Sequence, residues 1–184
     1  ILDDAGQTPL QSNFKFLHDI IARLQIEGHG VCILRNDISF GVCKARQRLI
    51  DEDLWKDNPY ICRLDDDVVL NSDYLELLVE AMEQYSNAGI VSGVTPNCSG
   101  PDITRDIKTV TPIINDITLD TEGNITKYTD DCGTLYNEDK TLLATNFRSM
   151  ALFRREVFNT IQYEMGLTTV GFREEARLSF RAIL

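Results

Sequence analysis

Long apolar stretches, signal-peptide features and paired cysteine motifs are all missing from this sequence. No apolar run approaches the roughly 20 residues that a membrane-spanning helix needs, and no signal peptide opens the chain, so we expect no membrane span in this segment. The five cysteines include no C-x-x-C pair and their number is odd, which indicates neither a disulfide framework nor a zinc site. We expect reduced, mostly buried thiols in a cytoplasmic protein.

Positive charge is also scarce. The chain has 18 Lys and Arg residues against 29 Asp and Glu residues, which gives a formal net charge of -11. A surface this acidic repels phosphate backbones, so we expect no nucleic-acid partner. The charge does not exclude a small phosphate-bearing ligand, because one bound metal ion can invert the local field.

The sequence shows no internal repeat, low-complexity tract or linker. Its 184 residues suffice for one domain with a sizeable core, and we expect a single domain over residues 1–184. The chain begins at Ile1 with a pattern typical of mid-strand, and it ends in "SFRAIL", which resembles an unfinished helix. We therefore expect a piece of a longer protein that lacks the first strand of its fold and a continuation after Leu184. Any membrane attachment would reside in those missing segments.

What the first half of the chain does have is a regular alternation of short strands and helices. Gly28 should end the first helix, and Asp73 with Glu76 should cap the third. The alternation predicts an α/β fold with a mainly parallel, Rossmann-type sheet flanked by helices. Apolar spacing predicts the helices at residues 13–28, 40–53 and 71–85, and the strands at 30–34, 60–65 and 89–94.

The alternation stops after Pro96. The segment "ITLDTEGNITKY", residues 117–128, predicts two strands joined by a Gly-containing turn, which adds a small β-hairpin to the second half. Residues 144–161 predict a strand followed by a helix, and residues 166–184 predict a loop that leads into a last helix.

One acidic run, Asp65-Asp66-Asp67, is distinguished by its position at the carboxyl end of a predicted strand. In open α/β sheets, ligands bind at that edge. Side chains alternate along an extended backbone, so Asp65 and Asp67 should point the same way and Asp66 the opposite way. Two carboxylates on one side suit Mg²⁺ or Mn²⁺ and leave coordination sites for substrate phosphates. A surface loop or a structural cation site is the alternative.

Four motifs, in this order and at these intervals, resemble family 2 glycosyltransferases of the GT-A fold. They are "LDDAG" near the start, then "GVCKARQRLID", "ICRLDDDVVL" and finally "GFREEARLSFR". The resemblance covers nearly the whole chain and implies a GT-A-like domain. Residues 1–95 would form its nucleotide-sugar-binding half, and residues 96–184 its acceptor-side half.

The resemblance also implies roles for particular residues. In the family, a first acidic pair contacts the nucleotide base, which matches Asp3 and Asp4 here. An Asp-x-Asp motif holds a divalent metal on the donor diphosphate, which matches Asp65 and Asp67 as metal ligands. By the same resemblance, the nucleotide sugar is contacted by Asp65, Asp66 and Arg46. The acidic pair Glu174 and Glu175 supplies the catalytic base, and Glu175 stands at the position of the base. Leu178 and Arg181 complete that motif.

These implied roles describe an inverting, hexosyltransferase-type enzyme that depends on Mn²⁺ or Mg²⁺. It would move a sugar from a nucleotide diphosphate donor to a hydroxyl of a carbohydrate or lipid-linked acceptor. Asp4 can accept a hydrogen bond from a uracil N–H, which favours a UDP-sugar over a purine nucleotide sugar.

Structural alternatives stay open for each residue. Asp3 and Asp4 can cap the turn before the first helix. Glu174 and Glu175 suit the first turn of a helix, where acids meet the positive end of the dipole, and Arg46 can be a helix-surface cation.

Two other functions also stay open. A sugar-phosphate nucleotidyltransferase should carry a Gly-rich, cationic loop where this chain has "DDAGQTP". A noncatalytic metal- or nucleotide-binding domain would bind without turnover.

Overall fold

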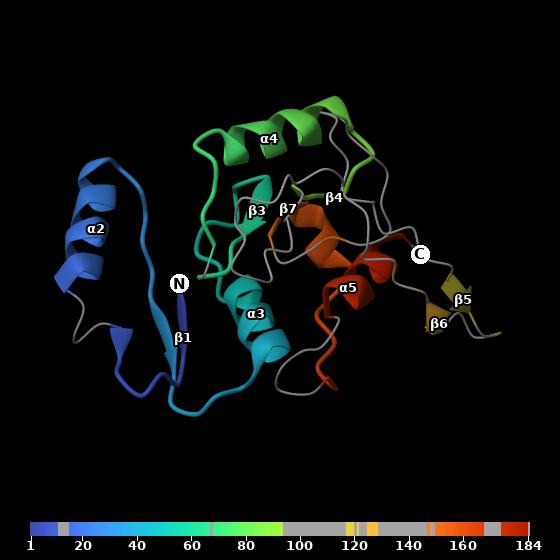
Figure 1. Cartoon of the computed structure of the whole chain (residues 1–184), viewed down its shortest axis with the longest axis horizontal. Helices are drawn as coiled ribbons and strands as arrows, with labels where there is room; N and C mark the ends of the chain where they lie inside the picture. The colour runs from blue at the N-terminus through green and yellow to red at the C-terminus, as the bar shows by residue number, and fades with distance from the viewer. Residues whose placement is uncertain are drawn as a thin grey trace, which may run out of the picture. The chain divides into compact units, whose positions relative to one another are not determined.

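The computed structural model describes most of the first half of the chain and selected parts of the second (Figure 1). The chain divides into two compact units, one made of Ile1–Lys56 with Gln162–Glu174 and the other of Asp57–Ile161 with Glu175–Leu184. The division at residue 95 into a nucleotide-sugar-binding half and an acceptor-side half describes ligand binding, and it stays a prediction. The described residues are 1–10, 15–66, 68–93, 117–119, 121, 125–128, 147, 150–167 and 174–183.

The first unit is built on a parallel pair of strands. Strand β1 (Leu2–Asp4) pairs in parallel with β2 (Leu34–Asn36), and helix α2 (Lys15–Ile26) forms the crossover between them. Helix α3 (Val42–Asp51) follows β2. This unit confirms the expected strand–helix–strand alternation, because parallel neighbours need a crossover of this kind.

Helix α2 ends where the sequence predicts. Gly28 has a φ of 87°, in the left-handed region that glycine adopts without a steric penalty. Its N–H donates to the Gln25 carbonyl at 3.1 Å, and the His29 N–H donates to the Leu24 carbonyl at 2.9 Å. The apolar stripe of α2 is less covered than expected, since no residue of the helix is fully buried.

The second unit contains a three-stranded sheet in the order β3–β7–β4. Strand β7 (Ala151–Arg154) lies between β3 (Tyr60–Arg63) and β4 (Ile90–Val91) and is antiparallel to both. The mainly parallel sheet predicted from the sequence is therefore not what these strands form. The apolar run of β7 lies in the central place and is the most buried of the three strands.

The core of the second unit lies between this sheet and helix α4 (Tyr74–Gln84), which covers one face of it (Figure 1). Leu78 and Met82 of α4 pack against Leu152 of β7, and all three are buried. Phe153, also fully buried, contacts Phe147 edge to face, with ring centroids 5.3 Å apart.

Other expectations for the second half are met in part. The predicted hairpin is present as β5 (Ile117–Leu119) and β6 (Ile125–Tyr128), which pair antiparallel with a register irregularity at Thr118/Leu119. The helix expected after β7 is only a short 3₁₀ segment, Arg155–Asn159.

The capping box predicted for α4 is wrong in part. Asp73 precedes the first residue of the helix, but its side chain makes no capping hydrogen bond. Its carbonyl accepts from the Leu77 N–H at 2.9 Å instead.

None of the helices in the described part of the chain is both long and apolar enough to pass through a bilayer. Three cysteines in that part, Cys32, Cys43 and Cys62, are free thiols. Burial raises the pKa of the Cys62 thiol. The sequence predicts mostly buried thiols, but of these three only Cys43 is buried, while Cys32 is intermediate and Cys62 is exposed.

Candidate active site

The acidic run follows strand β3 directly. The strand ends at Arg63, two residues earlier than predicted. Asp65 is half-buried, and Asp66 is exposed in a turn. Asp67 lies outside the described residues, so the same-side arrangement of Asp65 and Asp67 stays a prediction.

The donor chemistry at this position fits a hard divalent cation. Within the described ranges, no three His, Cys, Asp or Glu side chains gather closely enough to hold a metal ion. Mg²⁺ sites in phosphate-transferring enzymes, however, commonly use one or two carboxylates and fill the rest of the shell with water and substrate phosphates. Asp65 offers such a carboxylate two residues after the end of β3, and its proposed partner ligand Asp67 lies outside the described residues. The requirement for Mn²⁺ or Mg²⁺ stays a prediction, and carboxylate oxygens at this position agree with it.

Glu175 is joined to the end of strand β3 by an ion pair. It lies in the first turn of helix α5 (Glu174–Ile183), where Leu178 and Ser179 are buried. Its Oε1 lies 3.1 Å from Nη2 of Arg63, and the two residues are 112 positions apart in the sequence. The Glu175 side chain keeps 23% of its surface exposed and the Arg63 side chain only 9%. The structure thus brings the predicted base to the strand that leads into Asp65.

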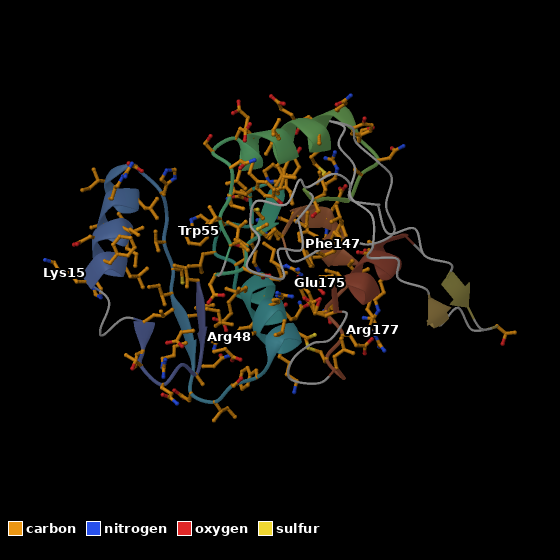
Figure 2. The ribbon with its side chains drawn as sticks, viewed as in Figure 1. Lys15, Arg48, Trp55, Phe147, Glu175 and Arg177 are labelled. Atoms are coloured by element: carbon orange, nitrogen blue, oxygen red, sulfur yellow. The ribbon has the colours of Figure 1, made fainter. Side chains whose placement is uncertain are left out.

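An aromatic ring completes the surroundings of Arg63. Its guanidinium lies over the ring of Phe147, 5.1 Å from the ring centroid. Figure 2 labels Phe147 and Glu175, which both contact this guanidinium.

Glu174 and Arg46 form a second ion pair, within the first unit. Arg46 extends from helix α3, and its Nη1 contacts Oε1 of Glu174. Glu174 keeps only 2% of its side chain exposed, against 19% for Arg46. The two acidic residues that begin α5 therefore have different environments: Glu174 is buried and Glu175 is partly open.

The carboxylate of Asp3 holds the turn after strand β1. It accepts hydrogen bonds from the N–H groups of Gly6 at 2.8 Å and Leu10 at 3.1 Å, and from the guanidinium of Arg35. These two backbone donors and the Arg35 cation hold the pKa of Asp3 below its ordinary value, although desolvation opposes them.

The carboxylate of Asp4 holds the loop that precedes helix α3. Partial burial works to raise the pKa of Asp4, but the donors around it outweigh that effect and keep the pKa below its ordinary value. A carboxylate has about four lone-pair sites, so these bonds use its acceptor capacity. Its donors are the Phe40 N–H at 3.0 Å, the Gly41 N–H at 3.1 Å, the Ser39 hydroxyl at 2.7 Å and the Asn36 amide.

Comparison with known protein families adds an independent observation. The sequence model described as glycosyl transferase family 2 matches residues 15–162. This chain belongs to glycosyl transferase family 2. A search of curated proteins found no match.

The family match confirms the resemblance inferred from the four motifs, and it implies a GT-A-type α/β fold and glycosyltransferase activity. The matched range includes Arg46 and the run Asp65–Asp67. It leaves out both acidic pairs at the ends of the chain, so the roles of those pairs in this glycosyltransferase depend on the geometry described above.

Several residues around the site were missed by the sequence analysis. Arg63 had a visible signal, since it is the one charge inside the apolar stretch "YICRL". Phe147 had no such signal, because an apolar residue in a polar segment does not predict a contact with a cation. Asn36 and Gln47 are buried polar residues, and Gln47 accepts a hydrogen bond from the Tyr163 N–H at 3.0 Å. Their burial is visible only in the fold.

Proposed function

We propose that this family 2 glycosyltransferase is an inverting hexosyltransferase that uses a UDP-sugar and Mn²⁺ or Mg²⁺. The acceptor is a hydroxyl of a carbohydrate or lipid-linked saccharide, and the free thiols favour a cytoplasmic location. The observation that carries this proposal is the ion pair between Glu175 and the last residue of β3, since it joins the proposed base to the strand that precedes Asp65.

The donor end of the proposed site is the acidic run. Asp65 and Asp67 would hold the metal ion, and Asp65 and Asp66 would contact the nucleotide sugar. A divalent ion bound there would supply positive charge to the diphosphate as it leaves. Without such a counter-charge, the carboxylates of this acidic chain would repel the donor.

The base of the proposed reaction is Glu175. As the acceptor oxygen forms its bond to the anomeric carbon, the bond from that carbon to the diphosphate oxygen breaks, and the electron pair leaves with the nucleoside diphosphate. The hydroxyl proton passes to the Glu175 carboxylate. Attack opposite the leaving group inverts the anomeric centre. Glu175 suits this step better than Glu174, because its side chain is partly exposed and Glu174 is buried against Arg46.

Three residues that the resemblance assigns to the nucleotide sugar, Asp3, Asp4 and Arg46, belong to the first unit and are described within it. The Asp4 carboxylate already accepts hydrogen bonds from the loop before α3, so it would have to exchange one of these donors for the uracil N–H that favours UDP. The Asp3 carboxylate likewise accepts hydrogen bonds in the turn after β1. Arg46 is proposed to contact the nucleotide sugar, since a guanidinium suits a diphosphate.

Calorimetric titration with UDP tests the donor site. We expect UDP to bind in the presence of Mn²⁺ and to bind at least about tenfold more weakly after addition of EDTA, because an ion held by Asp65 and Asp67 would supply the positive charge that offsets the diphosphate. Asp65→Ala and Asp67→Ala should each abolish the metal-dependent part. Asp19→Ala, an exposed acid of helix α2, is the matched control and should bind as the unmodified protein does. Equal UDP affinity with and without Mn²⁺ would contradict the metal role.

Substitution of the proposed base separates transfer from binding. Glu175→Gln should keep UDP binding and lower the release of UDP from a UDP-sugar by about 10²-fold or more, because general-base catalysis contributes about that much. Glu80→Gln, an exposed residue of α4, is the matched control. Binding without any turnover by the unmodified protein would favour a noncatalytic module. Release of pyrophosphate from UTP and a sugar phosphate would favour a nucleotidyltransferase.

A further inference from the structure

Arg63 is a largely buried cation in a strand that otherwise carries no charge. Only 9% of its side chain is exposed, and it ends strand β3 two residues before Asp65. Burial of a guanidinium costs free energy unless partners compensate for lost water. The contacts of Arg63 therefore show which groups compensate for the burial of its guanidinium.

Within the described part of the chain, Glu175 and Phe147 are among the residues that contact the guanidinium. Oε1 of Glu175 lies 3.1 Å from Nη2, and the face of Phe147 lies 5.1 Å from the guanidinium carbon. Phe147 is itself held by the core, because it is buried and its ring meets Phe153 of β7 edge to face at 84°. A chain of contacts thus runs from the central strand through Phe147 and Arg63 to the Glu175 carboxylate.

We propose that Arg63 is a positioning residue that orients the Glu175 carboxylate for the acceptor hydroxyl. The inference rests on the proposed role of Glu175 as the base. A carboxylate offers about four lone-pair sites, so Glu175 can accept from the guanidinium and from a hydroxyl at the same time. The aromatic face prevents Arg63 from turning away, and the ion pair limits the directions in which Glu175 can point.

The position of Arg63 gives this contact a second consequence. The same short segment carries Arg63 and, two residues later, Asp65, which is proposed to contact the donor. An acceptor base tied to that segment keeps its distance to the donor site, and catalytic rates are sensitive to displacements of about 1 Å. An ion pair to a flexible surface lysine would give no such constraint, since its stem has many rotamers.

The release of UDP from a UDP-sugar tests the proposal in the full chain with Mn²⁺. UDP-glucose, UDP-galactose and UDP-N-acetylglucosamine are compared first, and the donor with the fastest release is kept. We expect Arg63→Met, which retains an apolar stem, to lower kcat at least about tenfold and to change the donor KM less than about twofold. Arg63→Lys should recover part of the loss. Arg23→Met, in an exposed ion pair of α2, is the matched control.

A double-mutant cycle distinguishes positioning from general structural support. If Arg63 acts through Glu175, Arg63→Met should cost nothing further in a Glu175→Gln background. Multiplied losses in the double variant would overturn the proposal, as would a higher donor KM with kcat unchanged. Should Arg63→Met fail to fold, Phe147→Leu carries the same cycle, because it removes the aromatic face and keeps an apolar contact.

The failure of this inference and that of the proposed function are distinguishable. If the unmodified protein releases no UDP from any of the donors, the transferase proposal falls and the inference falls with it. If Glu175→Gln lowers kcat but Arg63→Met does not, the base assignment stands and only the positioning role of Arg63 is overturned.

Discussion

Replacement of Asp4 separates a structural role for this carboxylate from a ligand role. In the Asp4→Ala variant, the Asn36 amide loses its acceptor, and Asn36 keeps only 2% of its surface exposed. A buried donor left unsatisfied costs about 1–3 kcal/mol. The N–H groups of Phe40 and Gly41 and the Ser39 hydroxyl can turn partly to water, so they add less.

We therefore expect Asp4→Ala to lower the free energy of unfolding by about 2–3 kcal/mol. For a chain of this size, that loss corresponds to a fall of about 5–10 °C in Tm. It also lowers the urea midpoint by about 1–1.5 M at an m-value of about 2 kcal/mol/M. Asp4→Asn should cost nearly as much, because its NH₂ group would face existing donors. Ser39→Ala, which removes one exposed bond, should cost about 0.5–1 kcal/mol.

Thermal and urea unfolding, followed by circular dichroism, measure these losses, with Asp19→Ala as the control on an exposed acid. UDP titration of the same variants gives the second readout. An Asp4→Ala variant that melts within about 1 °C of the unmodified protein and no longer binds UDP would refute the reasoning. That result would return Asp4 to the role of a direct nucleotide ligand.

Two further predictions concern stability. The pKa values of Asp3 and Asp4 are lowered in the folded state, so the stability that these carboxylates contribute is present above the unfolded pKa of about 4 and is lost as the pH falls through the folded values. The urea midpoint of the unmodified protein should therefore fall between pH 5 and pH 3, and it should fall less steeply in Asp4→Ala. Equal slopes in the two proteins would contradict this linkage. Arg154→Met should lower the free energy of unfolding, measured in urea, by about 2–3 kcal/mol. The reason is that the Arg154 guanidinium donates to the carbonyls of Ala88 at 2.8 Å and Met82 at 2.5 Å near the end of α4. A loss no larger than that of Arg23→Met would show that water replaces the guanidinium at these carbonyls.

Much of the local structure could be predicted because local residues decide it. The end of α2 at Gly28 follows from one residue that tolerates a positive φ. Helix α4 follows from the spacing of Leu75, Leu78, Val79 and Met82, of which Leu78 and Met82 become its buried face, while Leu75 and Val79 are exposed. The hairpin at 117–128 follows from a turn signal between two β-prone segments. Each prediction needed only neighbours within a few positions along the chain.

Strand pairing could not be predicted in the same way. The alternation of strands and helices indicated parallel neighbours, and it holds for β1 and β2. Strand β7 enters from a distant part of the chain and separates β3 from β4, antiparallel to both. Nothing near residue 151 shows which strands it will join, because apolar strands compete for the same central position and burial decides between them.

The sequence by itself determined the family, the acidic run at the end of a strand, and the residue types that the proposed chemistry needs, because motifs and periodicity are written in neighbouring positions. Only the tertiary structure decided how these residues are used. It distinguished buried Glu174 from open Glu175, filled the Asp4 carboxylate with donors, and placed Arg63 against Glu175 across 112 residues. Burial and long-range partners set the availability of a charged group, and both exist only once the chain has folded.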